Sequence, residues 1–294
     1  MSRAGDPGKL VERLGRGTPL ERLSLTVDSS GYVDLRNLQI PSVREPDLAG
    51  LALDHVDFTG SNFENTRWVN CDFTHVKFDR VKGSGMNFAN SRIRHSSFVR
   101  ADLHRANWGW KDPPEPLIED CLFERTDLRQ TTHTHPRFRR CHFADCKFNG
   151  TVFTSRFEDC AFDGVVADVG FSAWERERGR TVRWNEMRNV DFSRAELRHV
   201  AFCGGIDLTH CRFAETGYLR VPHPRAAYIR ALDAARTWPE AWAKPVVEYL
   251  QNWIKQCYVE EQPFDLVRPE EFVEYFGEEA GHALVEELKR AIES

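Results

Sequence analysis

Large apolar residues recur every five positions through the middle of this chain. Apart from Gly83, the first run is unbroken and comprises Phe58, Phe63, Trp68, Phe73, Phe78, Phe88, Ile93, Phe98, Leu103 and Trp108. The pattern resumes across residues 118–162 and again across residues 192–218. A helix repeats every 3.6 residues and a strand every two, so neither element alone produces this period. A fixed internal period indicates a repeat architecture.

The position two residues before each large residue is small in nearly every repeat, as at Ser61, Thr66 and Cys71. The other three positions of each five are mostly polar. Two inward and three outward positions suit a coil that turns a corner in every repeat, with large and small side chains interdigitating inside. Successive coils would then stack about 4.8 Å apart, which is the spacing of hydrogen-bonded strands.

Segments such as ADLHR at residues 101–105 and CDFTH at residues 71–75 resemble the A-(D/N)-(L/F)-x-x unit of the pentapeptide-repeat family. The resemblance covers residues 51–218. It implies a mainly β fold, a right-handed four-sided parallel β-helix solenoid with about twenty residues per coil. Such a solenoid has a filled interior and flat outer faces.

The segment before residue 51 keeps the period only loosely. Val33, Leu38, Val43 and Leu48 are five residues apart, but bulky or proline residues occupy the positions where small ones belong. We therefore expect residues 1–50 to form an N-terminal cap and an irregular first coil.

Two short interruptions affect the central part of the solenoid. Residues 109–117 contain three prolines, which remove backbone donors from a strand ladder, so an insertion is expected there. The polar run at residues 131–136 places His133 on an inward position. We interpret this run as a second loop.

The longest interruption spans residues 165–187. Trp174 and Trp184 lie on either side of Gly179, with alternating charges between them. This pattern predicts a protruding hairpin or a long loop. Loops of this size on a compact scaffold are usually either functional or disordered.

Residues 219–294 change to helical spacing, with Val246, Leu250, Trp253 and Ile254 on one apolar stripe. A small C-terminal α-helical domain is therefore expected. We interpret it as a cap, because an open coil end exposes unpaired strand edges. A dimerisation element, giving a homodimer through these helices, and a separate binding module are the alternatives.

The net charge of −5 lies in the C-terminal region. Residues 48–218 carry 24 basic and 24 acidic side chains, whereas residues 219–294 carry nine basic and 14 acidic ones. A finely mixed, neutral rod lacks the basic stripe that nucleic-acid binding needs, so no direct nucleic-acid partner is expected. No stretch approaches the roughly 20 apolar residues that span a bilayer, and no signal peptide is evident. The expected location is cytoplasmic, without a membrane partner.

The cysteines predict no disulfide framework and no cofactor. No pair has C-x-x-C spacing, and six of the eight occupy the small inward position. These six are Cys71, Cys121, Cys141, Cys146, Cys160 and Cys211. We expect them to be buried free thiols that behave as small hydrophobic residues.

Three histidines twenty residues apart, His55, His75 and His95, are expected to stack into a column on one face. Imidazoles at strand spacing are weak candidates for a metal site. The residues before them are Asp54, Thr74 and Arg94, so no column of carboxylates accompanies the histidines. We therefore expect no metal. No phosphate-binding glycine loop, zinc-protease motif or nucleophile elbow is found, so the chain is not expected to be an enzyme.

The residues that fail to keep the period are the better candidates for partner binding. Tryptophan and arginine are the residue types most enriched at interface hot spots. The candidates are Trp110, Trp174, Arg176, Arg178, Arg180, Arg183 and Trp184. The alternative is that the tryptophans fold back and fix their own loops.

The best-understood pentapeptide-repeat proteins bind DNA gyrase or topoisomerase IV and resemble a DNA duplex in width and negative surface. This chain departs from them in its neutral coil and its multi-helix C-terminal region. The first hypothesis is therefore a non-catalytic protein-interaction scaffold that uses a β-helix face, the projecting loops and the helical tail. The alternative is a DNA-mimic-like modulator of gyrase or topoisomerase IV that gives resistance or immunity to topoisomerase poisons. A metal-binding or enzymatic protein that uses the histidine column is the lowest alternative.

Overall fold

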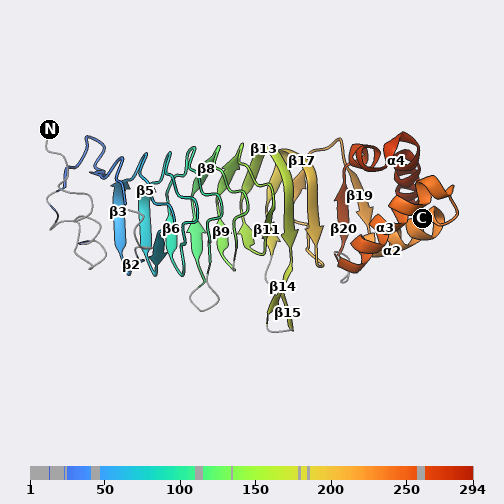
Figure 1. The fold of residues 1–294 in the computed structure, drawn as a ribbon, viewed down its shortest axis with the longest axis horizontal. Coiled ribbons are helices and arrows are strands. Elements are labelled where there is room, and N and C mark those ends of the chain that lie inside the picture. Colours follow the sequence, from blue (N-terminus) through green and yellow to red (C-terminus); the bar gives the residue numbers. More distant parts are fainter. Residues whose placement is uncertain are drawn as a thin grey trace.

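The chain forms a rod of stacked coils that ends in a group of helices (Figure 1). A computed structural model describes residues 13, 23, 25–40, 47–109, 115–133, 135–177, 180–183, 186–256 and 262–293. Strands of successive coils run parallel, and the helices follow the last coil. The predicted fold class, a mainly β solenoid with a small C-terminal helical part, is confirmed.

Most strands are short because they span a single side of a coil, whereas β13 (Ala161–Ser172) and β17 (Asp191–Cys203) continue around corners and are 12 and 13 residues long. The elements are β1 (Val33–Asp34), β2 (Asp47–Ala49), β3 (Ala52–Asp57), β4 (Arg67–Val69), β5 (Asp72–Lys77), β6 (Arg92–Arg94), β7 (Leu117–Glu119), β8 (Leu122–Glu124), β9 (Arg137–Arg139), β10 (His142–Ala144), β11 (Thr151–Phe153), β12 (Arg156–Glu158), β13 (Ala161–Ser172), β14 (Trp174–Glu177), β15 (Arg180–Arg183), β16 (Met187–Arg188), β17 (Asp191–Cys203), β18 (Arg212–Phe213), β19 (Leu219–Pro222), α2 (Pro224–Ala235), α3 (Glu240–Gln256), β20 (Phe264–Val267) and α4 (Pro269–Glu293).

One side of the rod is an eight-stranded sheet in the order β1-β3-β5-β6-β7-β9-β12-β16. A six-stranded sheet has the order β18-β17-β13-β10-β8, and its sixth strand, β11, pairs with β13. Phe73 of β5 pairs with Ile93 of β6, twenty residues later. Ile93 then pairs with Ile118 of β7, twenty-five residues later, because the coil between them carries an insertion. The register therefore absorbs extra residues without changing which side chains face inward.

The large inward residues form columns along the rod axis. Phe98 stacks on Phe123 with ring centroids 4.8 Å apart, and Phe123 stacks on Phe143 at the same distance. Rings on adjacent sides of a coil meet edge to face, as Phe58 and Phe63 do at 87°. Stacked and T-shaped pairs are both favourable aromatic geometries, so one residue type satisfies two directions of packing.

The small inward residues connect each coil to the one before it. Ser91 Oγ donates to the carbonyl oxygen of Trp68 (3.0 Å) and accepts from the backbone N–H of Cys71 (3.0 Å). Thiols take the same place, and Cys146 Sγ lies 3.3 Å from the carbonyl oxygen of Phe123. Because these backbone groups are buried, the contacts give them hydrogen-bond partners inside the rod.

The first coil corrects the sequence-based register. Val33 pairs with Val56, which places Val33 on a small position, and Leu38 lies beside Ser61. Leu35, which is 3% exposed, fills the large position instead. The period of five breaks between Leu35 and Leu48, because residues 41–46 add length before Leu48 returns to register; residues 41–46 lie outside the described residues.

The second correction concerns the longest interruption. Residues 165–172 are part of β13 and pair with β17, so only the segment after Ala173 leaves the coil. Val166 and Phe171 are fully buried and continue the inward column. The sequence-based insertion at 165–187 was therefore too long, because the spacing from Phe162 to Val166 is four residues and the next step is five.

His133 also lies inside the coil rather than on a loop. Its side chain is 6% exposed and occupies an inward position, with its ring centroid 4.2 Å from that of Phe153. The predicted second loop was wrong for this residue, because an imidazole has nearly the shape of the aromatic rings that fill the other coils.

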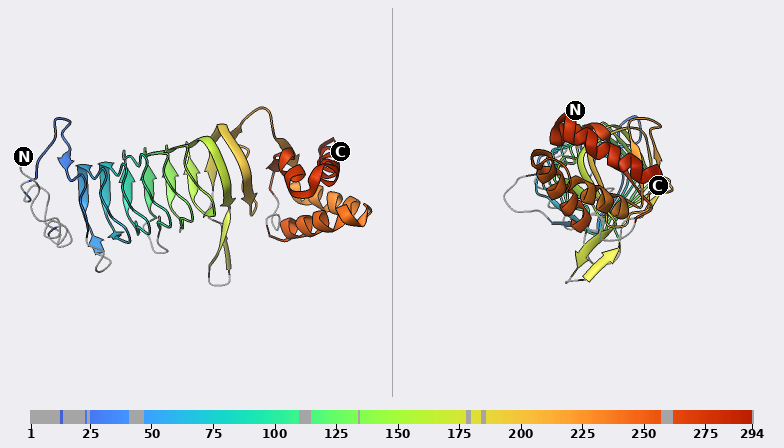
Figure 2. Two further views of the ribbon diagram at one scale, coloured as in Figure 1. Left: turned by 45° about the horizontal axis from the view of Figure 1, so that its top comes forward. Right: turned by 90° about the vertical axis from the view of Figure 1, so that its right-hand side faces the viewer.

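The helices lie over the end of the last coil (Figure 2). Between the last coil and the helices, β19 and β20 form an antiparallel pair. The Phe264 ring of β20 packs edge to face on Phe213 (6.4 Å between centroids). Tyr228, Leu250 and Leu284 belong to a separate apolar core shared by α2, α3 and α4. Within the described part of the chain, no helix is both long and apolar enough to cross a membrane.

Candidate functional site

The β14–β15 hairpin projects from the side of the rod (Figure 1). The N–H of Ala173, just before the hairpin, still donates to the carbonyl oxygen of Cys203 (3.0 Å). The carbonyl oxygen of Glu186, just after it, accepts from the N–H of Phe157 (2.8 Å). Both ends of the hairpin are thus fixed by the ladder, which gives the projection a defined base.

The pairing register of the hairpin assigns the predicted binding residues to the two faces of the ribbon. Trp174 pairs with Arg183, and Glu177 pairs with Arg180. Residues directly opposite in an antiparallel pair lie on the same face, and faces alternate along each strand. Positions Trp174, Arg176 and Arg183 therefore share one face of the ribbon, whereas Arg180 lies on the other. The remaining candidates, Trp110, Arg178 and Trp184, lie outside the described residues.

The coil face that leads into the hairpin carries no charged residue over much of its length. Its outward positions, here called the uncharged face, are Asn87, Asn107, Thr132, Val152, Thr154, Gly170, Ser172, Ala201 and Cys203. Charged residues make up 29% of the chain, so this set departs from the composition. Val152 is 55% exposed near its middle. The face is therefore flat and weakly polar, and β13 runs directly from it into β14.

The neighbouring faces carry charge as close pairs of opposite sign. Arg94 Nη2 lies 2.9 Å from Asp72 Oδ1, and Arg140 Nε lies 2.7 Å from Asp120 Oδ1. The hydrogen bond from Arg140 lowers the pKa of the Asp120 carboxyl below its ordinary value, although partial burial opposes it. Both pairs join different coils, so the charges neutralise each other locally.

A column of arginines follows one corner of the rod. Arg80, Arg100 and Arg125 all have positive φ angles near 50–60° and occupy equivalent corner positions. Arg80 and Arg100 line one surface depression together with Asp79 and Glu124. The adjacent face carries five acidic residues, together with Lys77 and Arg212; the acidic residues are Asp57, Asp79, Glu124, Asp163 and Asp191. The arginine column borders this face over three coils, and Asp145 takes the same corner position in the next coil.

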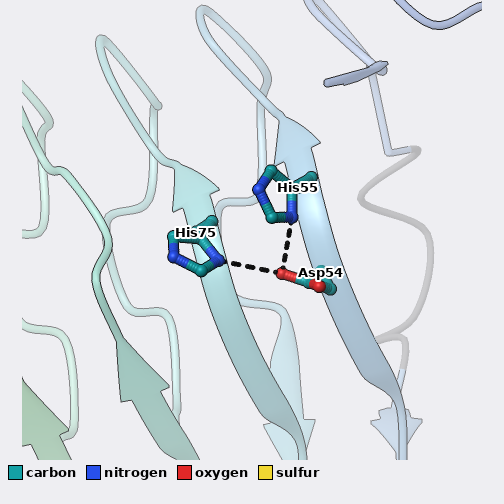
Figure 3. A group of neighbouring side chains, drawn as sticks. All are labelled: Asp54, His55 and His75. Atoms are coloured by element: carbon teal, nitrogen blue, oxygen red, sulfur yellow. Dashed lines mark hydrogen bonds and ion pairs between the residues drawn. The ribbon is translucent and has the colours of Figure 1, made fainter. Parts of the chain in front are cut away.

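The predicted histidine column is present. The ring centroids of His55 and His75 are 4.4 Å apart, and those of His75 and His95 are 5.1 Å apart. Asp54 lies beside the first two (Figure 3): Asp54 Oδ1 is 2.9 Å from His55 Nδ1 and 3.1 Å from His75 Nδ1. His95 differs, because its Nδ1 atom lies 3.5 Å from Asp120 instead. One carboxylate thus serves two imidazoles of neighbouring coils.

A small pocket of about 90 Å³ lies between the last coil and the helices. Tyr249, Trp253 and Tyr275 contribute aromatic walls, and Glu271 lies among them. Burial raises the pKa of Glu271, although its Oε1 atom accepts from the N–H of His199 (2.7 Å). Ligand pockets for metabolites usually enclose about 300 Å³ or more. The pocket therefore suits the attachment of α4 to the coil better than substrate binding.

Sequence reasoning missed two features of this surface. The uncharged face and the place of Asp54 between His55 and His75 both depend on which residues stack across coils. Reading outward positions one coil apart, as was done for the histidines, would have found each of them.

The comparisons with known proteins agree with the coil geometry. A family model described as pentapeptide repeats (8 copies) matches residues 53–82. No curated protein sequence matches the chain.

Three solved structures illustrate the likeness. A trypsin-treated variant of QnrB1, described as a plasmid-mediated fluoroquinolone resistance protein, is 15% identical; the match covers 58% of this chain and 90% of that one, with a TM-score of 0.26. Full-length QnrB1 is 19% identical, with coverage of 58% and 87% and a TM-score of 0.21. The pentapeptide repeat protein Rfr23 from the cyanobacterium Cyanothece 51142 is 14% identical, with coverage of 45% and 86% and a TM-score of 0.17. Superpositions this poor carry no argument about function.

Proposed function

Because the chain is a pentapeptide-repeat protein, we propose that it is a non-catalytic scaffold that binds a protein partner through the β14–β15 hairpin and the uncharged face beside it. The observation that carries this proposal is the continuity of β13 from the uncharged face into the hairpin. A partner that contacts the uncharged face therefore also contacts the β14–β15 hairpin.

The chemistry of the two surfaces supports a protein partner. When a partner covers an uncharged face, no charged side chain loses its hydration, so the desolvation penalty on binding is small. The hairpin adds Trp174, Arg176 and Arg183 on one face of the ribbon, and these residue types dominate interface hot spots. The helical tail adds a third surface at the end of the rod.

The arrangement of charge favours this scaffold role over imitation of a DNA duplex. A DNA mimic needs a long acidic face. Arg80, Arg100 and Arg125 border the most acidic face described here, and the face with Asp72 also carries Arg94. A topoisomerase that recognises negative surface would therefore meet alternating charge.

The remaining features fit a non-catalytic protein of a reducing compartment. The inward positions are filled by apolar and small polar side chains and by His133, and the pocket beside the helices is smaller than most metabolite sites. No disulfide joins the described cysteines. Because disulfides are rare where thiols are kept reduced, we propose the cytoplasm as the location.

The test compares two double variants of the full-length protein. Trp174→Ala/Arg183→Ala removes one face of the hairpin, and Glu175→Ala/Val182→Ala changes a matched pair on the opposite face. Affinity capture from the native host, followed by measurement of Kd with the purified partner, should show at least about thirtyfold weaker binding for the first variant, since two hot-spot residues are lost. The second variant should bind as the wild type does.

Val152→Arg tests the uncharged face in the same assay. Because the introduced charge would be buried on binding, this variant should bind the partner more weakly than the wild type does. The proposal fails if all three variants capture the same partner with equal affinity. The topoisomerase alternative is tested with the same protein: a dose-dependent effect on gyrase supercoiling, or on quinolone-stabilised cleavage, would favour it over the scaffold role.

A further inference from the structure

We propose that Asp54, His55 and His75 bind one divalent transition-metal ion, such as Zn²⁺ or Co²⁺, on the surface of the first regular coils. The sequence favours no metal here because carboxylates do not recur beside the histidines. That objection no longer applies, because the single carboxylate of Asp54 contacts both imidazoles. The three potential ligand atoms all lie within 4.8 Å of one another.

The distances are close to those of a metal site. Imidazole nitrogen and carboxylate oxygen bind Zn²⁺ at about 2.0–2.2 Å, so ligand atoms around a tetrahedral ion are about 3.4 Å apart. The nitrogen-to-oxygen distances of 2.9 Å and 3.1 Å are slightly shorter, as expected when hydrogen bonds join the groups. The two imidazole nitrogens lie within 4.8 Å of each other, and rotation of these exposed side chains brings them to the tetrahedral spacing. Water completes the coordination of the ion.

The backbone fixes both histidines before any ion arrives. His55 and His75 have φ angles of 51° and 53°, and each occupies the corner that ends one side of its coil. The strands around them are paired, with Asp54 opposite Thr74 and Val56 opposite Val76. Since the ladder holds the Cα positions, little main-chain entropy is lost on binding.

The local charges suit a cation with moderate affinity. The carboxylate of Asp54 supplies one anionic ligand beside the two imidazoles. Lys77 lies over the ring of Tyr32, which packs on His55 at 5.4 Å, and this positive charge opposes a bound cation. Side-chain exposures of 63%, 45% and 40% keep the ion in exchange with solvent.

His95 provides a matched control within the same column. Its ring stacks on His75 at an interplanar angle of 16°, but its Nδ1 atom is directed at Asp120. Removing His95 therefore changes the stack without removing a ligand. His55→Ala, His75→Ala and Asp54→Asn each remove one.

The experiment uses untagged, chelator-treated, full-length protein titrated with Co²⁺ and with Zn²⁺ by calorimetry, and with Co²⁺ by visible absorption. We expect one equivalent to bind. Loss of even an outer partner of a metal ligand typically weakens affinity 10–100-fold, so each ligand variant should raise Kd at least about tenfold. His95→Ala should leave Kd and the Co²⁺ spectrum unchanged. Circular dichroism checks that each variant is folded. Absence of saturable binding to the wild type, or wild-type affinity in the ligand variants, overturns the proposal.

Discussion

At the scale of single residues, a missing side chain in one inward position is compensated by its neighbour. Gly83 occupies a large position, and a Cβ atom there would overlap Met86 Sδ and lie 2.9 Å from Leu103 Cδ2. Met86 is fully buried on what is elsewhere a small position. A flexible thioether fills irregular space well, so the break in the period at Gly83 is an exchange of volumes and the coil continues through it.

His133 is a second residue that departs from the pattern, and its environment determines its protonation. Thr131 Oγ1 donates to the carbonyl oxygen of Leu128 (2.8 Å) and so accepts from His133 Nε2 (2.9 Å). This assigns the proton to Nε2, and the buried Nδ1 atom has no hydrogen-bond donor within the described residues. Burial lowers the pKa of His133 from 6.5 to about 3, so the folded protein holds a neutral imidazole.

His133→Phe is expected to stabilise the protein, increasingly so at acidic pH. Above pH 6.5 the imidazole is neutral in both states, and removing an unsatisfied buried nitrogen should gain about 1–3 kcal/mol. Below pH 6.5 the unfolded wild type binds a proton that the folded state cannot hold until about pH 3, so wild-type stability falls by up to about 1.4 kcal/mol per pH unit. Urea denaturation at about pH 8, 6 and 5 measures the difference.

The exposed His104→Phe is the control for this prediction, since His104 lies on the surface beside Gln130. A difference between His133→Phe and wild type that stays constant from pH 8 to pH 5 would contradict a buried neutral imidazole.

At the scale of single elements, the short strands depend on side chains that link one coil to the next. Cys121, Cys141 and Cys160 lie in consecutive coils, and each Sγ atom lies 3.4–3.5 Å from a carbonyl oxygen of the coil before it. Serine and threonine make the same contact elsewhere in the rod. The inward cysteines therefore have a structural role, and we expect their thiols to be unreactive.

Thiol reactivity should follow this burial. Burial raises the pKa of Cys71 to about 11 and that of Cys146 to about 12, and it raises those of Cys141 and Cys160 well above 9. Because the thiolate is the reactive form, the six inward cysteines should not react with a disulfide reagent at about pH 8 in the native state. Native protein should show at most two reactive thiols, and denatured protein all eight. Rapid reaction of more than two native thiols would mean that the coils open readily.

The period of five predicted the element type and the inward residues well, because packing repeats wherever the coil repeats. It failed at Val33, Val166 and His133. Register in these places is set by hydrogen bonds between coils, and a coil can gain or lose a residue at a corner while the ladder continues. The spacing of residues along the chain does not reveal such changes in coil length.

The candidate site was predicted in part, and the reason is similar. The alternating charges around Gly179 predicted a hairpin, and β14 and β15 form one. The uncharged face and the contacts of Asp54 could not be found from local sequence, because their members are a whole coil apart. Residues that stack in neighbouring coils can be identified from the sequence only when the length of each coil is known.

At the scale of the whole molecule, the helical part closes one end of the rod. Phe264 and Leu266 of β20 join the core of the coils, whereas Val267 belongs to the core of the helices. Glu271 of α4 accepts from the N–H of His199 on β17. β20 therefore connects two cores, and the strand edge of the last coil is covered where these contacts lie.

Phe264→Glu is expected to detach the helices and expose that edge. Loss of a large buried aromatic side chain costs about 3–5 kcal/mol, and the carboxylate would be buried against Phe213 if the contact persisted. Uncovered strand edges associate, so sedimentation velocity should show concentration-dependent oligomers. Limited proteolysis before α2 checks that the helices have detached. Ile292→Ala, on an exposed part of α4, is the control. Unchanged sedimentation of detached Phe264→Glu would argue against a capping role.

The direction of the backbone hydrogen bonds has a mechanical consequence. Bonds such as that from Phe98 N–H to the Leu122 carbonyl oxygen (2.8 Å) connect successive coils, and β3 and α4 lie towards opposite ends of the molecule (Figure 1). Tension between the termini therefore pulls along these bonds and loads the coils in series. The end coil, which has a neighbour on one side only, yields first, and extension proceeds one coil at a time. A sideways load meets many coils in parallel, so the rod is a stiff spacer across its width and a stepwise extensible one along its axis.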